Sequence, residues 1–547
     1  MDEIFQSVNA FFAFIAPISD LFWDFPTRYP WYSRIPILGN FSFAIILLVG
    51  AGIHFTIRTR FVQMTNMRKI VRIMLRRRSS GTGVSALASF MLGLAMRAGP
   101  GNIVGITGAI SVGGPGALFW MWVAAFFGMA TAFMESVLAQ LFKERKGDEF
   151  VGGLPFYGRR ILGDRRAVGT FLSLVFIAYA LFNVPPQTFN VFTAIGTIAD
   201  TVAGAPIGRR STLYYLIAAG LVFACSFIIL GGIRRVVAYT DVLVPIKAVL
   251  FCVMSLIIIL INLPLVPYFF REVFVGAFAP HALFGGAIGT ALAQGVKRGL
   301  MSNEAGQGTI TMAAAVADNS HPCEQGFVQS LGVFFDTMVI CTMTGFIVVM
   351  AHVWTGTVDG QAWESVKASK ITVYLGSVQA LVPASVGGAV KIVMCVCYGL
   401  FAFTTLLGMI SFAEISANFI SRSPRFITGI RVLGSLVFVP FGALTVLAGL
   451  ELPNLWALSD LMNIIMVYLN VPILLLGSGL VYKALAHYRA TQGDQFVSAH
   501  IGVQTDCWVE ARLLQARDAR QAAPGAAPPH RPASAQPGRK RSASSAQ

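Results

Sequence analysis

Long stretches of the chain carry no charged side chain. Asp, Glu, Lys and Arg are absent from Ile35 to Ile57 and again from Ala98 to Phe133. About 20 consecutive apolar residues can cross a lipid bilayer as an α-helix, because a helix satisfies its own backbone hydrogen bonds. Only 12% of the 547 residues are charged and 55% are hydrophobic, whereas soluble domains carry roughly 25% charged residues. These features predict an all-α polytopic membrane protein.

Eleven segments are long and apolar enough to cross a bilayer as helices. The predicted spans are 35–57, 85–113, 115–142, 168–195, 211–232, 239–264, 283–317, 325–354, 384–418, 427–449 and 454–482. The sequence GGPG at Gly113–Gly116 predicts a tight turn between the second and third spans. The apolar run 11–18 is too short to span and follows an acidic start, so we expect no cleaved signal peptide.

The basic residues predict the orientation of these helices. The net charge is +16, and Lys and Arg gather between the apolar segments, above all in 58–78 and 143–166. Two spans separate these loops, and Lys and Arg are enriched in cytoplasmic loops. We therefore expect a protein of the cell inner membrane with its N-terminus outside and its C-terminus in the cytoplasm. The sequence has no nucleic-acid-binding motif, and we expect no nucleic-acid partner.

Two of the predicted spans are interrupted. The second contains MRAGPGNIVG (96–105), in which Pro100 lacks an amide N–H and the glycines weaken the helix. The seventh contains GLMSNEAGQG (299–308), which places an amide and a carboxylate near the bilayer centre. The two interrupted spans are five helices apart along the chain, with four spans between them, so they run in opposite directions. Paired breaks in two inverted halves indicate the binding site of a secondary transporter. A structural GxxxG packing motif at Gly101 and Gly105 is the alternative.

We therefore expect six regions along the chain. They are an N-terminal periplasmic or interfacial segment (1–34), an extra N-terminal transmembrane helix (35–57), a basic cytoplasmic loop (58–84), a first five-helix repeat (85–264), a second, inverted five-helix repeat (283–482) and a cytoplasmic, largely disordered tail (483–547). Disorder is expected in the tail because its Pro-, Ala- and Ser-rich sequence cannot bury a core.

The first break suits both a carboxylate and a cation. A half-helix that begins in mid-membrane directs N–H groups and a partial positive charge toward the break. The amides of Gly101, Asn102 and Ile103 are predicted to lie there and to bind a carboxylate. The preceding half-helix ends near Ala98, and its free carbonyls suit a small cation such as Na⁺.

The second break supplies oxygens for the ammonium group of an amino acid. We expect Asn303, Glu304 and the backbone around Gly306 to provide them. Glu304 has two alternative roles, as a proton carrier or as a structural partner of Lys297 or Arg298. The Gly-rich backbone at both breaks leaves room for only a small substrate side chain.

Other polar residues lie within the apolar spans. Thr404 and Thr405 present adjacent hydroxyls that suit Na⁺, although such hydroxyls also bond back to the preceding helical turn. Gln187 follows two prolines and, with Asn190, is a candidate for lining a cavity. The residues expected to serve helix packing are Glu135, Asp336, Asp460 and Asn463.

Five stretches of sequence are specific enough to suggest a family. They are GNIVGITGAISVGGPGALFWMWVAAFFGMATAFMESVLAQLFKER, VGGLPFYGRRILG, GVKRGLMSNEAGQGTITMAAAVA, HPCEQGFVQSLGVFFDTMVICTMTG and FAFTTLLGMISFAE. On these stretches the chain resembles the alanine or glycine:cation symporters, the sodium:alanine symporter family, from about Ser85 to Tyr482.

The resemblance implies the ten-helix inverted-repeat fold of the bacterial leucine transporter, plus one extra N-terminal helix. It also implies import of alanine, glycine or D-alanine coupled to Na⁺ and, in some members, to H⁺. The family's cation site lies between the first break and adjacent hydroxyls on the eighth core helix, which match Ala98 and Thr404–Thr405 here. The family usually has Ser or Thr where this chain has Pro100, and a small polar residue where it has Phe189.

We therefore predict a Na⁺-coupled symporter that imports small neutral amino acids by alternating access. An uncoupled or H⁺-coupled facilitator or channel is the alternative. An enzyme is not expected, because the seven histidines are scattered and neither HExxH nor GxSxG occurs. The expected partners are the amino acid, Na⁺ as coupling ion and the lipid bilayer, with no cofactor and no obligate protein partner.

Overall fold

The structure is a computed structural model that describes residues 14–35, 38–65, 67–75, 82–207, 211–278, 288–353, 370–447, 452–493 and 496–509. Several parts of the predicted regions lie outside the described residues, the longest being 1–13 of the N-terminal segment, 76–81 of the basic loop, 283–287 and 354–369 of the second repeat, and 510–547 of the tail.

Helices make up almost all of the described secondary structure. The first part of the chain forms α2 (Pro30–Ser33), α3 (Phe43–Arg58), α4 (Val62–Thr65), α5 (Met67–Met74), α6 (Ala86–Arg97), the 3₁₀ turn η2 (Pro100–Asn102), α7 (Val104–Gly113), α8 (Gly116–Leu141), β1 (Glu144–Lys146), β2 (Glu149–Val151), α9 (Leu154–Ile161), α10 (Arg166–Phe182), α11 (Val184–Ala203), α12 (Thr212–Leu230) and α13 (Ile233–Ile261). The second part forms α14 (Val266–Phe278), α16 (Ile288–Asn303), α17 (Ile310–Ala315), α18 (Pro322–Val333), the π-helix η4 (Phe334–Cys341), α19 (Thr342–Ala351), α21 (Lys370–Ala380), α22 (Ala384–Ala417), α23 (Pro424–Val432), α24 (Val439–Leu447) and α25 (Leu452–Thr491). The all-α class is confirmed, with one short antiparallel hairpin, β1–β2, added.

Eight helices in the described part of the chain are long and apolar enough to cross a membrane. They coincide with eight of the eleven predicted spans. The other three predicted spans, 35–57, 85–113 and 283–317, contain the 16-residue helix α3 and the two interrupted helices α6–α7 and α16–α17.

The predicted turn at Gly113–Gly116 joins α7 to α8. Gly114 has a positive φ of 69°, which a glycine adopts without strain. At Gly116 the helix starts so close to Gly276 of α14 that a Cβ would lie 2.3 Å from the Gly276 backbone. This turn therefore requires glycine for both its conformation and its packing.

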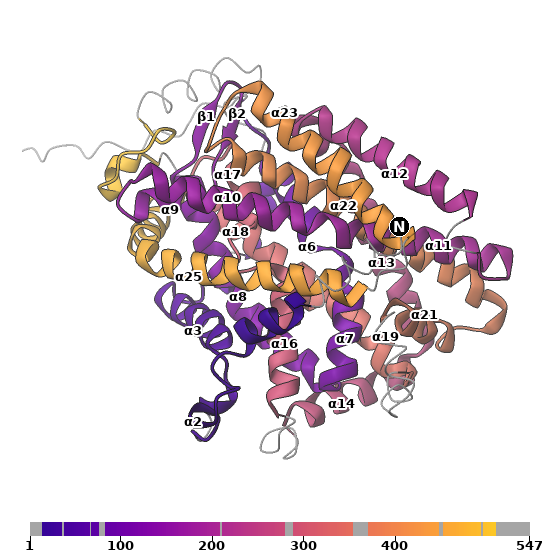
Figure 1. Cartoon of the computed structure of the whole chain (residues 1–547). Helices are drawn as coiled ribbons and strands as arrows, with labels where there is room; N and C mark the ends of the chain where they lie inside the picture. Colours follow the sequence, from indigo (N-terminus) through magenta and orange to yellow (C-terminus); the bar gives the residue numbers. More distant parts are fainter. Residues whose placement is uncertain are drawn as a thin grey trace, which may run out of the picture.

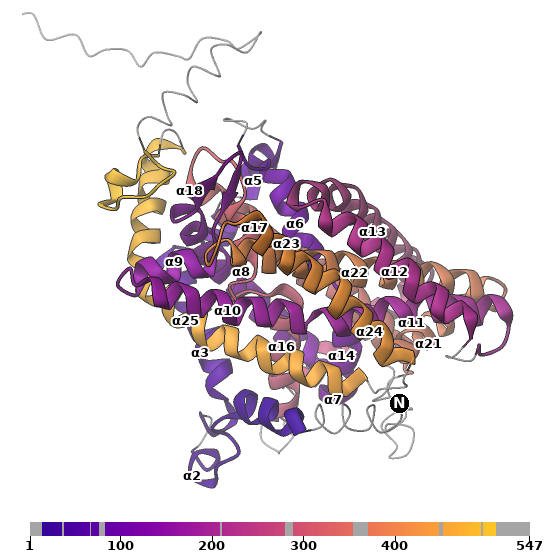
Figure 2. The same ribbon diagram turned by 45° about the horizontal axis from the view of Figure 1, so that its top comes forward.

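The two interrupted helices cross in antiparallel fashion. The first half of one packs against the second half of the other, since α6 contacts α17 and α7 contacts α16. Figures 1 and 2 show the same arrangement, with α6 and α17 toward the end that carries β1–β2, and α7 and α16 toward the opposite end. This antiparallel crossing brings the two breaks together in the middle of the helix bundle.

Each break has a local cause. Pro100 begins the short turn η2, where its missing N–H and fixed φ are compatible with a helix start but not with a continuous helix. The second break contains three residues with positive φ, namely Glu304 (57°), Gly306 (96°) and Gly308 (77°). Since a non-glycine residue rarely adopts positive φ, Glu304 is held there by its surroundings.

The C-terminal end of the described chain is folded. The helix α25 continues to Thr491, and beyond it Phe496 and Trp508 are buried. The Trp508 indole N–H donates to the Gln140 carbonyl of α8 at 2.6 Å. The prediction of a largely disordered tail from residue 483 is therefore wrong for 483–493 and 496–509. The Pro-, Ala- and Ser-rich composition on which that prediction rested does not extend to 496–509, where Ile501 and Cys507 are buried as well.

Three stacked histidines lie at this end of the bundle. His487 lies between His321 and His500, with ring nitrogens 3.3 Å and 3.2 Å apart respectively, and the His321 ring packs edge-on against Phe496. Burial lowers the pKa of His321 to about 3. The His321 ring is therefore neutral at neutral pH in the folded protein.

Acid is expected to loosen the packed C-terminal segment. A lowered folded-state pKa stabilises the packed state above the unfolded value near 6.5, and this contribution is lost as pH falls toward 3. Amide hydrogen exchange of residues 496–509, corrected for intrinsic rates, should be faster at about pH 5 than at pH 7.5, while α8 changes little. The His321 Nδ1 accepts the Cys323 amide at 3.1 Å at the start of α18. His321→Asn keeps an acceptor for this amide but cannot titrate, so it should flatten the pH dependence. Equal protection of the native protein at both pH values would contradict the role of the histidines.

Candidate functional site

A cavity of about 530 Å³ lies at the two breaks. Its polar and charged lining residues are Ser19, Asp20, Arg97, Tyr179, Asn183, Gln187, Gln294, Lys297, Arg298, Glu304, Lys370, Thr405, Ser459, Asp460 and Asn463. Between them the backbone of Gly99, Pro100, Gly101 and Gly105 lines the first break. The cavity extends from the breaks to Trp456 near the beginning of α25.

Three of the seven predicted substrate residues line this cavity. They are Gly101 at the first break, Gln187 on α11 and Glu304 at the second break. The Glu304 carboxylate accepts a hydrogen bond from the Thr309 hydroxyl at 2.7 Å. Thr405, predicted as a Na⁺ ligand, also lines the cavity.

The other four predicted substrate residues lie outside the cavity lining. The Asn102 and Ile103 amides donate to the carbonyls of Gly99 (3.1 Å) and Pro100 (3.0 Å) within the η2 turn. The Asn303 side chain accepts the Ala305 amide at 3.0 Å, and the Gly306 amide donates to Glu135 at 2.6 Å. These groups stabilise the backbone conformation of the breaks. Their positions in the sequence did not distinguish this structural role from contact with a substrate.

Glu135 of α8 anchors the second break. One carboxylate oxygen accepts the amides of Gly306 at 2.6 Å and Gly308 at 3.2 Å, and the Asn470 side chain at 2.8 Å. Its second oxygen is buried and has no hydrogen-bond partner among the described residues. The expected helix-packing role of Glu135 is thus more specific: it satisfies backbone N–H groups that the break exposes.

Asp336 connects the two breaks to the π-helix η4. The Asn102 side-chain amide of the first break donates to it at 2.6 Å. The hydroxyls of Ser302, beside the second break, and Thr337 donate to its other oxygen. All four side chains are buried. A π-helical turn often marks a functional position, because it redirects a side chain at the cost of regular helical bonding.

Arg97 is a site residue that the sequence analysis missed. Its side chain is 1% exposed at the end of α6, and it lines the cavity. Its Nε donates to the Asn303 carbonyl at 3.0 Å and its Nη1 to the Gln329 carbonyl at 2.8 Å. The second terminal nitrogen, Nη2, is buried without a hydrogen-bond partner among the described residues. An arginine directly before a break in an apolar span was the available signal.

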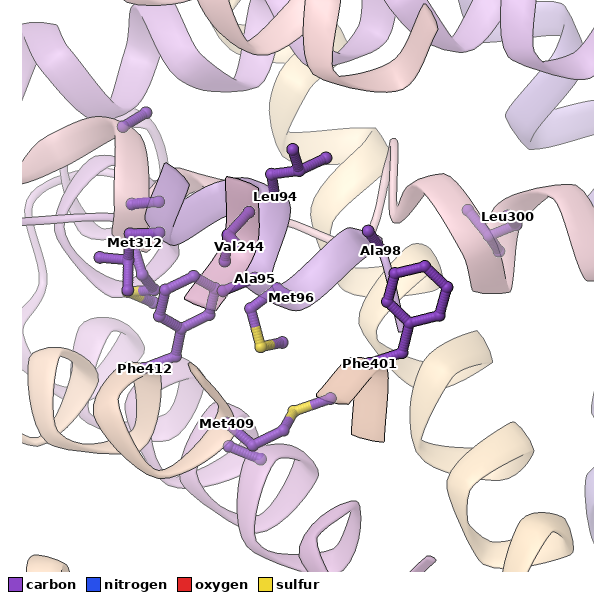
Figure 3. Close-up of a cluster of buried hydrophobic side chains, with 14 of the residues drawn as sticks. Leu94, Ala95, Met96, Ala98, Val244, Leu300, Met312, Phe401, Met409 and Phe412 are labelled. Carbon is purple, nitrogen blue, oxygen red and sulfur yellow. The ribbon is translucent and has the colours of Figure 1, made fainter. Parts of the chain in front are cut away.

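The structure brings the three predicted cation ligands together at the end of α6. The Thr405 hydroxyl donates to the Ala95 carbonyl at 3.1 Å. The Ala98 carbonyl and the Thr404 hydroxyl share a neighbour that was not predicted, the amino group of Lys247 from α13. Figure 3 shows the apolar side chains of Met96, Val244, Phe401 and Met409 around this end of α6.

Several other polar residues have partners that differ from those expected. Lys297 and Arg298 lie 3.7 Å and 3.6 Å from the Asp460 carboxylate, so the suggested structural pairing of either residue with Glu304 is wrong. Asp460 and Asn463 were expected only to serve helix packing, but both line the cavity. Asn190 accepts the Tyr398 hydroxyl at 2.8 Å and is absent from the cavity lining.

Comparison with known proteins identifies the family. The model of the "Sodium:alanine symporter family" matches residues 35–500. The chain belongs to this family. This symporter is 35% identical to the amino-acid carrier protein AlsT of Bacillus subtilis, over 83% of this chain and 91% of AlsT. It is 33% identical to the sodium/alanine symporter AgcS of Methanococcus maripaludis, over 84% of this chain and 96% of AgcS. The protein is thus a multi-pass membrane transporter and not an enzyme.

Two further comparisons bear on substrate and fold. The probable sodium/glutamine symporter GlnT of Bacillus subtilis is 34% identical to this symporter, over 85% of this chain and 92% of GlnT. The crystal structure of MhsT in complex with L-phenylalanine has a similar fold, with a TM-score of 0.54 and 14% identity over 80% of this chain and 96% of MhsT. Relatives thus differ in the amino acid for which they are named.

Glu135→Ala is expected to destabilise the symporter. The substitution removes the acceptor of two buried amides and the Asn470 side chain, and each buried group left unpaired costs about 1–3 kcal/mol. The midpoint of thermal unfolding in detergent should therefore fall. Glu135→Gln keeps a carbonyl acceptor and should lose less. Glu272→Ala, on α14, is the control; an effect as small as this control's would contradict the anchoring role.

Proposed function

We propose that this symporter imports a small neutral amino acid, such as alanine, glycine or D-alanine, by alternating access. The observation that carries the proposal is the cavity between two broken helices that cross in antiparallel fashion. Breaks of this kind concentrate helix-end dipoles at one place within the membrane, where both charged ends of an amino acid find partners.

We further propose that the core consists of two inverted five-helix repeats, 85–264 and 283–482, preceded by α3 as an extra helix. The antiparallel crossing of the two interrupted helices supports the inversion, and the similarity to MhsT supports the fold. In this arrangement the proposed substrate lies at the boundary between the repeats. Rocking one repeat against the other then changes the side from which the cavity opens.

Each end of the amino acid has a proposed partner. Arg97 offers a buried guanidinium nitrogen that has no hydrogen-bond partner in the described part of the chain, and the Gly101 amide lies at the start of the second half-helix. We assign the substrate carboxylate to these two groups. The Glu304 carboxylate receives the ammonium group, and Gln187 lines the wall between them. Asn102, Ile103, Asn303 and Gly306 act by holding the breaks.

We propose a cation gradient as the driving force, with Na⁺ as the cation that the family name indicates. Asp336, with the Ser302 and Thr337 hydroxyls, supplies oxygen ligands of the kind that hard cations prefer, next to both breaks. An H⁺-coupled or uncoupled facilitator is the second candidate function. The amino group of Lys247 among the predicted Na⁺ ligands favours it.

Uptake of radiolabelled alanine into proteoliposomes tests the proposed function. An inward Na⁺ gradient should drive accumulation above the outside concentration, whereas K⁺ on both sides should not. Accumulation driven by an inward H⁺ gradient, or equilibration without accumulation, would favour the second candidate. The absence of both uptake and alanine exchange, with glycine, D-alanine and glutamine also inactive, would contradict transport of these amino acids.

Glu304→Gln is expected to weaken substrate binding. Losing the charge that faces the ammonium group costs about 1.5–3 kcal/mol, which corresponds to a KM for alanine raised tenfold or more. Uptake kinetics at saturating Na⁺ measure this change. Glu272→Gln, the same substitution on α14, should leave the KM unchanged. A KM for Glu304→Gln within twofold of the native value would remove Glu304 from the substrate site.

A further inference from the structure

Lys247 places a buried amino group at the end of α6. The residue lies on α13 and is 0% exposed. Its Nζ donates to the Ala98 carbonyl at 2.7 Å, to the Thr404 hydroxyl, and at 3.4 Å to the Ala95 carbonyl. An ammonium group has three donors and no acceptor, so these three oxygens match its full hydrogen-bonding capacity.

The position is one that favours a cation. Ala95 and Ala98 are at the C-terminal end of α6, where carbonyls lack helical partners and carry the negative end of the helix dipole. The aromatic ring of Phe401 on α22 lies 5.2 Å from Nζ and adds a cation–π contact. Figure 3 shows the Phe401 ring beside Ala98. Dipoles and a ring face thus surround the amino group.

A carboxylate does not neutralise this amino group directly. In the described part of the chain, no carboxylate lies within salt-bridge distance of the Lys247 Nζ. The charge that acts on it is that of Asp336 in η4, while Arg97 of α6 is directed at Asn303 and Gln329. Burying an ammonium group without an ion pair is expensive, and an apolar side chain would fill the same space without that cost. Packing alone therefore does not account for a lysine here.

We propose that the ammonium group of Lys247 is a tethered cation that takes the place of Na⁺ between Ala98 and Thr404. The site would then bind no Na⁺ during transport, and any Na⁺ that drives import acts elsewhere. The part of this inference that concerns transport rests on the proposed function. The part that concerns Na⁺ binding does not. It is an alternative to the prediction that Ala98, Thr404 and Thr405 bind Na⁺.

Two physical reasons exclude Na⁺ while Lys247 is present. First, Na⁺ would need the same Ala98 and Thr404 oxygens that the amino group already contacts. Second, two positive charges sharing these oxygens would repel each other strongly in a buried site of low dielectric constant. Removing the amino group while keeping the side-chain length should therefore open the site to Na⁺.

Equilibrium binding of radioactive ²²Na⁺ to the purified full-length protein in detergent tests this proposal. Lys247→Met should bind one more Na⁺ per chain than the native protein. The double variant Lys247→Met, Thr404→Val should lose the additional ion or bind it at least tenfold more weakly. Lys391→Met, the same substitution at a lysine of α22, is the control and should match the native stoichiometry. A folded Lys247→Met protein with native stoichiometry would overturn the proposal.

A second measurement keeps the proposal testable if Lys247→Met fails to fold. Thr404→Val in the otherwise native chain should leave the number of bound Na⁺ ions and their half-saturating concentration unchanged, because the site already holds an ammonium group. A tenfold rise in that concentration, or the loss of one bound ion, would overturn the proposal. Both measurements count ions and not amino acids, so failure of alanine uptake would contradict the proposed function alone.

Discussion

The backbone groups that two broken helices expose inside the bundle are the constraint on which the rest of this structure depends. Within a bilayer each unsatisfied N–H or C=O costs several kcal/mol, so a break persists only where side chains replace the helical bonds. Glu135 does this for the Gly306 and Gly308 amides, and Lys247 does it for the Ala98 carbonyl. The polar residues near the breaks follow from this requirement, and the cavity lies where they converge.

The same constraint explains why several charged side chains are buried in a chain that has few charged residues. Lys247 faces the C-terminal end of α6 and Arg97 that of α16, whereas Glu135 accepts amides at the second break. Asp336 joins both breaks and acts electrostatically on both basic residues. Each charge therefore meets either a helix end of opposite polarity or a charge of opposite sign. Within this network Arg97 has a donor available for a ligand, because one of its nitrogens has no hydrogen-bond partner among the described residues.

The interrupted helices could be predicted because their causes are local. Pro100 and the glycines of both breaks forbid a regular helix wherever they occur, and the turn at Gly113–Gly116 has the same kind of cause. The lining residues Gln187 and Glu304 could be predicted because polar residues are rare in apolar spans. The family resemblance, now confirmed, added the pairing of Ala98 with Thr404 and Thr405.

The partners of the site residues could not be predicted, because they come from distant parts of the sequence. Lys247 lies 149 residues from Ala98, and no local pattern indicates that its amino group reaches the first break. Asn102 turns away from the cavity because Asp336, 234 residues later, accepts its amide. The bond between Trp508 and Gln140 of α8 likewise joins residues that lie 368 positions apart in the sequence. Sequence pattern thus located the breaks, and only tertiary contacts revealed what satisfies them.

The central claim is that an amino acid binds in the cavity between the two breaks. An experimental structure of the purified protein with bound alanine tests it most directly. The account predicts density for alanine beside Gly101 and Glu304, with its carboxylate within hydrogen-bond distance of Arg97. Alanine bound at a place that touches neither break would contradict it.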